Sequence, residues 1–271
     1  MGTHLHLIDH YLRIKSPIHS LDGRLKLIFC LALILCTSWL PAGSWAAYIF
    51  LLSILLTLTI LADIDLAYLL KRSFLFLPFL LAALPIIFKG SGITLASFSI
   101  GAMDVKISQE GLLHFIGLGV KSWISVSAAI MLASTTSYTE LLQAMRSLKF
   151  PQLLVAVFGL MWRYLHVMVE EVDHLVRARL SRSGSDPASQ FPTGGRLGWR
   201  ARVTGAMAGN LFIRSLERSE RVYQAMLSRG YDGEIRTLEI TPPARKDIAL
   251  LFVVITTMFT LTFLFVYFSG N

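Results

Sequence analysis

Long apolar runs separated by short polar stretches are the feature that most constrains this chain. Five such runs occupy residues 25–40, 44–62, 73–88, 112–136 and 248–268. A helix of about 20 apolar residues crosses the hydrocarbon core of a bilayer. Only 15% of the 271 residues are charged, against roughly a quarter in soluble domains. The sequence therefore predicts an all-α, polytopic membrane protein with about five transmembrane helices.

Two of these runs contain residues that are unusual in a membrane helix. Pro78 and Pro85 predict that the third run is kinked or broken, with neighbouring helices satisfying the freed carbonyls. Lys121 in the fourth run is expected to face protein or to reach the membrane interface. The two cysteines, Cys30 and Cys36, share the first run and are expected to be small buried apolar residues, without a disulfide or a metal.

Basic residues set the expected orientation. The N-terminal arm carries Arg13, Lys15, Arg24 and Lys26, the loop after the second run carries Lys71 and Arg72, and segment 137–247 carries 16 of the 25 lysines and arginines; the other side has only Lys89 and Lys106. Because cytoplasmic loops are rich in Lys and Arg, both the N-terminus and segment 137–247 are predicted to be cytoplasmic and the C-terminus outside. The net charge of +8 then reflects membrane topology, and no nucleic-acid binding is expected.

This pattern divides the chain into residues 1–136, with four transmembrane helices, a cytoplasmic helical domain at 137–247, and a last transmembrane helix at 248–271. The cytoplasmic segment begins with a short helix for which Thr139 is the expected cap, ending before Pro151. A second helix is predicted over 152–183 and a third over 204–229, separated by a loop rich in Gly, Ser and Pro. Acidic residues in the second helix, among them Glu171, are expected to pair with Arg163 or Arg177 at helical spacing.

Each long cytoplasmic helix has a continuous apolar stripe. The positions that carry the stripes are Leu154, Phe158, Met161, Leu165, Met168, Val172 and Leu175 in the second helix, and Phe212, Leu216, Tyr223 and Met226 in the third. One amphipathic helix cannot bury such a stripe alone. We therefore expect contacts with the other helix, with the membrane surface or with a partner protein.

The ends of these two helices share the pattern Ala-x-Leu-Ser-Arg. Ala178, Leu180, Ser181 and Arg182 correspond to Ala225, Leu227, Ser228 and Arg229. A cation followed by glycine is a common helix ending and explains a single copy. Two copies suggest a function, because an arginine at a helix tip can pair with a carboxylate of another subunit.

Three stretches carry a resemblance to a known family: "HLIDHYLRIKSPIHSLDGRLKLI", "LLQAMRSLKFPQLL" and "RSLERSERVYQAMLSRGYDG". Over essentially its whole length, the chain resembles the T component (EcfT) of energy-coupling factor transporters, and most of all the cobalt-type member CbiQ. The resemblance implies an L-shaped, all-α fold in a bacterial inner membrane. It also implies two coupling helices that end in Ala-Arg-Gly-like triplets and insert into grooves of two ATPase subunits.

The corresponding triplets here are Ser181-Arg182-Ser183 and Ser228-Arg229-Gly230. Serine replaces alanine in both, and Ser183 also replaces the glycine of the first. The implied partners are two cytoplasmic CbiO-like ATPases and a substrate-binding CbiM-like membrane subunit, with a CbiN-like small subunit. The residues expected to pack against the substrate-binding subunit or between helices are Phe158, Met161, Leu165, Met168, Phe212, Leu216, Tyr223 and Met226.

The sequence contains no motif for chemistry of its own. It has no P-loop, no His-Glu-x-x-His motif and no paired cysteines, so no catalytic residue, cofactor or metal is expected. The histidines at positions 4, 6 and 10 lie on the predicted cytoplasmic side, away from the uptake face. The resemblance implies ATP-driven cobalt uptake, with nickel or a vitamin as alternative substrates. An autonomous secondary transporter is the alternative of another class, and the scarcity of ionisable residues in the spans argues against it.

Overall fold

The computed structural model describes residues 16–41, 43–88, 94–100, 103–182, 197–233 and 245–269. Contacts divide the chain into two units, one formed by Met1–Leu148 with Ile240–Asn271 and the other by Lys149–Glu239. The predicted segment 137–247 therefore begins inside the first unit, where its short first helix packs against the helix Gly23–Trp39.

The first unit is a helical bundle with one hairpin. Its α-helices are α1 (Gly23–Trp39), α2 (Trp45–Leu61), α3 (Leu66–Ser73), α4 (Leu77–Ala82), α5 (Gln109–Thr135), α6 (Tyr138–Ser147) and α9 (Arg245–Ser269), with 3-10 turns η2 (Phe74–Phe76) and η3 (Leu84–Phe88). Strands β1 (Thr94–Ile100) and β2 (Met103–Ser108) pair antiparallel. The predicted helical membrane fold is confirmed, and this hairpin is an addition that the sequence did not reveal.

Three described helices are long and apolar enough to cross a membrane: Gln109–Thr135, Gln152–Arg182 and Arg245–Tyr267. Trp45–Leu61 is a shorter apolar helix. The second of the three lies in the segment predicted to be cytoplasmic. Its assignment to the cytoplasm therefore depends on charge distribution and on the resemblance, because length and composition alone also suit a membrane span.

The third apolar run is broken, as its prolines predict. It forms α3, η2, α4 and η3 in succession instead of one helix. Pro78 lies in the first turn of α4, where a missing N–H breaks no helical hydrogen bond. The last piece approaches α5 very closely. A Cβ at Gly111 would lie 2.5 Å from the Ile87 carbonyl oxygen, so only glycine fits there.

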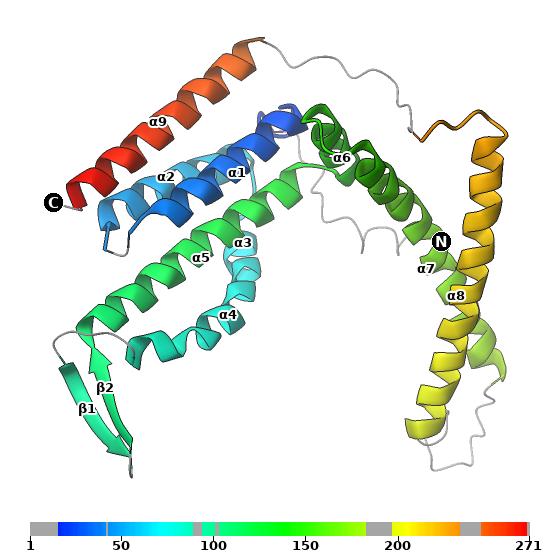
Figure 1. The fold of residues 1–271 in the computed structure, drawn as a ribbon, viewed down its shortest axis with the longest axis horizontal. Helices are drawn as coiled ribbons and strands as arrows, with labels where there is room; N and C mark the ends of the chain where they lie inside the picture. The colour runs from blue at the N-terminus through cyan, green and yellow to red at the C-terminus, as the bar shows by residue number, and fades with distance from the viewer. Residues whose placement is uncertain are drawn as a thin grey trace. The chain divides into compact units, whose positions relative to one another are not determined.

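The core of the bundle lies between α1, α2, α5 and α9, which run alongside one another in Figure 1. Leu33, Tyr48, Leu51, Ile124 and Met258 are among its almost completely buried side chains. Cys30 and Cys36 are buried and free, which confirms their interpretation as small apolar residues.

Two lysines tie α1 and α5 together. Lys26, only 7% exposed, donates to the Thr135 carbonyl (3.0 Å) at the end of α5 and to the His19 carbonyl (3.1 Å). Lys121 of α5 donates to the carbonyl of Leu40, the C-cap of α1. Each lysine thus lies at the negative end of the other helix's dipole. Lys121 faces protein, one of its two predicted positions, whereas the burial of Lys26 was not predicted.

The second unit contains two long helices, α7 (Gln152–Arg182) and α8 (Leu197–Leu227). The first agrees with its predicted range to within one residue. The other begins seven residues before its predicted start, because residues at the end of the expected loop are already helical.

The cap predicted for α6 is wrong: the side chain of Ser137, not Thr139, accepts from the backbone N–H of Glu140 (3.3 Å).

Candidate docking surface on the paired helices

The two helices of the second unit cross in opposite chain directions (Figure 1). Near the middle of each helix, Arg214 Nη1 lies 2.6 Å from Glu171 Oε1. Closer to the end of α7, Arg179 Nη1 donates to Thr204 Oγ1 (3.1 Å), near the start of α8. The second contact lies later in α7 than the first (Arg179 against Glu171) but earlier in α8 (Thr204 against Arg214). The two helices are therefore antiparallel. Arg182 and Arg229 therefore lie at opposite ends of the pair.

The apolar stripes of both helices remain largely uncovered. Ala156 is the only buried residue of α7, and no residue of α8 is buried. Of the predicted packing residues, Phe158, Met161, Leu165, Phe212, Leu216 and Tyr223 are exposed, and Met168 and Met226 are partly buried. Exposed apolar surface of this extent is typical of a binding surface. The contacts between the helices are polar at the crossing, so α7 and α8 do not bury each other's stripes.

The end of α8 has a defined cap. Gly230 has φ +78°, Gly230 N–H donates to Leu227 O (2.9 Å), and Tyr231 N–H donates to Met226 O (3.0 Å). These two bonds and the left-handed glycine constitute a Schellman motif. The cap fixes the direction in which the chain leaves the helix and leaves Arg229 exposed beside it. The glycine cap that the sequence suggested is thus present.

The end of α7 repeats part of this arrangement. Ser181 Oγ donates to Ala178 O (2.9 Å), and Ser228 Oγ donates to Ala225 O (3.0 Å), so the matched serines bond back to the matched alanines. Leu180 and Leu227 are both exposed, 64% and 44%. Each tip therefore presents a leucine and an arginine, while its serine hydroxyl is bonded within its own helix. Ser183 lies outside the described residues.

The pairing predicted for Glu171 is wrong. Its partner is Arg214 of α8, not Arg163 or Arg177 of its own helix. Spacing within one helix cannot reveal a partner on another helix. The equal length of the two helices, 31 residues each, appears only in the structure, so the sequence offered no signal for this pair. Among the described residues no group of three or more metal-ligating side chains occurs, and the histidines at positions 4, 6 and 10 lie outside that part.

Comparisons with known proteins agree on one family. A family model described as cobalt transport protein, CbiQ, matches residues 14–239. An uncharacterized protein of Methanocaldococcus jannaschii is 30% identical over 94% of this chain and 85% of its own length. The energy-coupling factor transporter transmembrane protein EcfT of Staphylococcus aureus is 28% identical over 85% of both chains. The cobalt transport protein CbiQ of Rhodobacter capsulatus is 26% identical over 60% of this chain and 63% of its own. The chain therefore belongs to the CbiQ family of cobalt transport proteins, membrane components of energy-coupling factor transporters.

Proposed function

We propose that this chain is the coupling subunit of an ATP-driven cobalt uptake transporter. The observation that carries the proposal is the pair of exposed Leu-Ser-Arg tips at opposite ends of the antiparallel helices α7 and α8. Two similar tips at opposite ends of a helix pair suit two similar partner subunits, because the surface of one subunit could not contact both tips. The sequence has no nucleotide-binding motif, so ATP hydrolysis belongs to these partners.

Each tip binds one cytoplasmic ATPase subunit. The arginine enters a groove and pairs with a carboxylate, while the neighbouring leucine, Leu180 or Leu227, contacts an apolar part of that groove. Segment 137–247 is then the coupling domain and lies in the cytoplasm with the N-terminus, and the C-terminus lies outside. This orientation agrees with the excess of Lys and Arg in that segment.

The apolar stripes of α7 and α8 bind the substrate-binding membrane subunit. Movement of the ATPases displaces the two tips, and the crossed helices transmit the displacement to the stripes and to that subunit. The subunit determines the substrate, for which we propose cobalt, consistent with the name of the family. Uptake of radioactive cobalt with nickel as competitor tests this part: an excess of nickel that abolishes cobalt uptake would contradict the assignment.

Charge reversal at the tips tests the coupling role. Arg182→Glu and Arg229→Glu should leave the amount of membrane-inserted protein unchanged but reduce co-purification of the ATPases about thirtyfold or more, since losing a desolvated charge pair costs about 2–5 kcal/mol. Arg163→Glu on α7 and Arg221→Glu on α8 are matched controls, because both arginines are exposed and lie eight or more residues before the tip arginine of their own helix. Normal ATPase co-purification with the double tip variant would refute the proposal. So would metal uptake by the purified chain alone in liposomes, which would indicate an autonomous transporter.

A further inference from the structure

The bundle of the first unit contains a partly open cavity that the proposed coupling function does not use. Its volume is about 320 Å³, and its walls come from α1, α2, α5 and α9 together with the turn before α1. The lining is almost entirely apolar. Cavities of this size with a few polar groups are typical of sites for small or amphipathic ligands.

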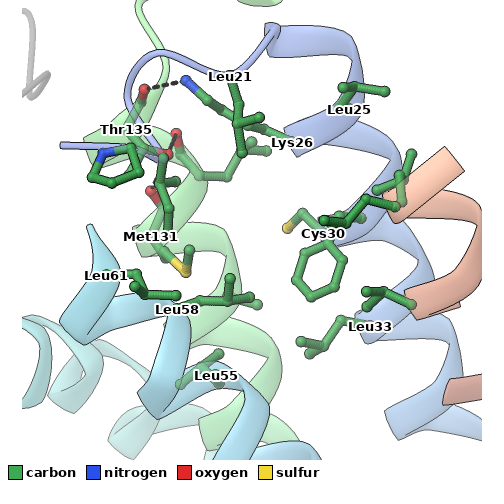
Figure 2. Close-up of a pocket in the computed structure, with 18 of the residues that line it drawn as sticks. Leu21, Leu25, Lys26, Cys30, Leu33, Leu55, Leu58, Leu61, Met131 and Thr135 are labelled. Atoms are coloured by element: carbon green, nitrogen blue, oxygen red, sulfur yellow. Dashed lines mark hydrogen bonds between the residues drawn. The ribbon is translucent and has the colours of Figure 1, made fainter. Parts of the chain in front are cut away.

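One end of the cavity is polar. Lys26 and Thr135 lie at that end, and Leu33 and Leu55 lie at the other (Figure 2). The Lys26 ammonium has three donor hydrogens and two carbonyl acceptors among the described residues, His19 O and Thr135 O. The carboxylates of Glu140 and Asp22 also stabilise its charge, and one donor hydrogen is left to bind a ligand.

A carboxylate lies at the same end. Asp247, in the first turn of α9, also lines the cavity. In Figure 1, α9 runs in the same direction as α1, so their first turns share one end of the bundle. The cavity therefore has a polar end with one cation and one anion and an apolar remainder. A purely anionic ligand would be repelled by Asp247, and a purely cationic one by Lys26.

We propose that this cavity binds one acyl chain of a zwitterionic phospholipid with a primary-amine headgroup. The lipid phosphate accepts a hydrogen bond from Lys26, the lipid ammonium faces Asp247, and the acyl chain extends towards Leu33 and Leu55. Basic pockets between membrane helices bind anionic lipid headgroups, and the additional carboxylate of Asp247 in this lining favours a zwitterionic headgroup. The site is in the membrane unit and does not depend on the ATPase contacts proposed above.

Native mass spectrometry of the full-length chain tests this proposal. The chain is purified from nanodiscs that contain equal amounts of phosphatidylethanolamine, phosphatidylglycerol and phosphatidylcholine. We expect one retained phospholipid per chain, with phosphatidylethanolamine favoured. Asp247→Asn should remove the preference over phosphatidylglycerol, and Lys26→Met should lower retention of all three lipids about tenfold, as for the loss of one charged hydrogen bond. Lys71→Met is a control on α3, outside the lining. Equal retention of the three lipids, or a preference for phosphatidylglycerol, would overturn the headgroup assignment.

A substitution that fills the cavity distinguishes lipid binding inside it from lipid binding on the outer surface of the bundle. Ala128 lines the cavity and is buried, whereas the adjacent Ala129 is exposed. Ala128→Phe should abolish lipid retention and Ala129→Phe should not; equal retention by both variants would refute the site. A phosphatidylethanolamine with a photoreactive acyl chain, applied to the unaltered protein, avoids any effect on folding. Cross-links to Cys30 or Met131 are expected, and cross-links confined to exposed residues of α9 such as Phe252 would overturn the proposal.

Discussion

Glu171 of α7 and Arg214 of α8 form, among the described residues, the one ion pair that joins the two long helices, with 2.6 Å between Oε1 and Nη1. Their side chains are 24% and 53% exposed, so the pair contributes little to stability, about 0–1 kcal/mol. Its position near the middle of both helices gives it another role. We expect it to influence the point at which the helices cross.

We therefore expect Glu171→Arg to move or loosen the crossing without unfolding the protein. Cysteines introduced as Arg179→Cys and Thr204→Cys, with Cys30 and Cys36 replaced by alanine, would report this through the yield of cross-linking by a short bismaleimide. The yield should fall several-fold in Glu171→Arg because two arginines then repel each other. It should recover in the exchanged pair Glu171→Arg with Arg214→Glu. Glu170→Arg is the control, and an equal loss of yield there would show that the effect is not specific to the pair.

The cap of α8 predicts opposite effects for two glycine substitutions in the same region. Gly230 has φ +78° and open space where a Cβ would lie, so Gly230→Ala costs only backbone strain, about 1–2 kcal/mol. Gly209, inside α8, has equal space and no such φ, and Gly209→Ala should stabilise the helix by about 1 kcal/mol. Thermal unfolding in detergent would measure both. Gly230→Ala should also weaken ATPase co-purification, and a destabilising Gly209→Ala would contradict this account of the helix.

Close packing of η3 against α5 predicts a further contrast. A methyl group at Gly111 would overlap the carbonyl oxygens of Ile87 and Ile86, whereas one at Gly119 would meet only the flexible end of the Leu80 side chain. Gly111→Ala should therefore destabilise the bundle by about 1–3 kcal/mol, and Gly119→Ala by much less. The midpoint of thermal unfolding in detergent is the measurement. Equal midpoints for the two variants would mean that η3 does not approach α5 as described.

The proposed orientation can be tested with two alanines of similar exposure. Ala46 is the second residue of α2, on the proposed outer side, and Ala67 is the second residue of α3, on the proposed cytoplasmic side. In a background without Cys30 and Cys36, Ala46→Cys should react with a membrane-impermeant maleimide in intact cells. Ala67→Cys should react only after permeabilisation. The reverse pattern would show that the chain is inserted the other way round.

The membrane helices could be predicted well from the sequence because their cause is local. A run such as 44–62 must form a helix in lipid whatever surrounds it, and Pro78 interrupts a helix in any context. The same holds for the cap at Gly230, where three or four neighbouring residues determine the geometry. The stripes on α7 and α8 were also visible, since period and composition reveal them without knowledge of the fold.

Features that depend on residues far apart in the chain could not be predicted. Glu171 has candidate partners within its own helix, and nothing local favours Arg214 over them. Lys26 looked like one more basic residue of a cytoplasmic arm, because its acceptor, the Thr135 carbonyl, is more than a hundred residues away. The hairpin of β1 and β2 occupies a segment whose apolar and polar residues give no strong helical period. The cavity likewise exists only once four helices have packed.

The two lysines that link α1 and α5 have a consequence for how the protein enters the membrane. An isolated α5 would expose the Lys121 ammonium to lipid at a cost of roughly 2.5–3.5 kcal/mol. The Leu40 carbonyl that accepts from Lys121 belongs to α1, which leaves the ribosome first. Insertion of α5 is therefore favoured once α1 is already in the bilayer. The order of synthesis thus places the Leu40 carbonyl in the membrane before the Lys121 ammonium that it binds. Lys26 of α1 in turn gains the Thr135 carbonyl as an acceptor when the end of α5 is inserted.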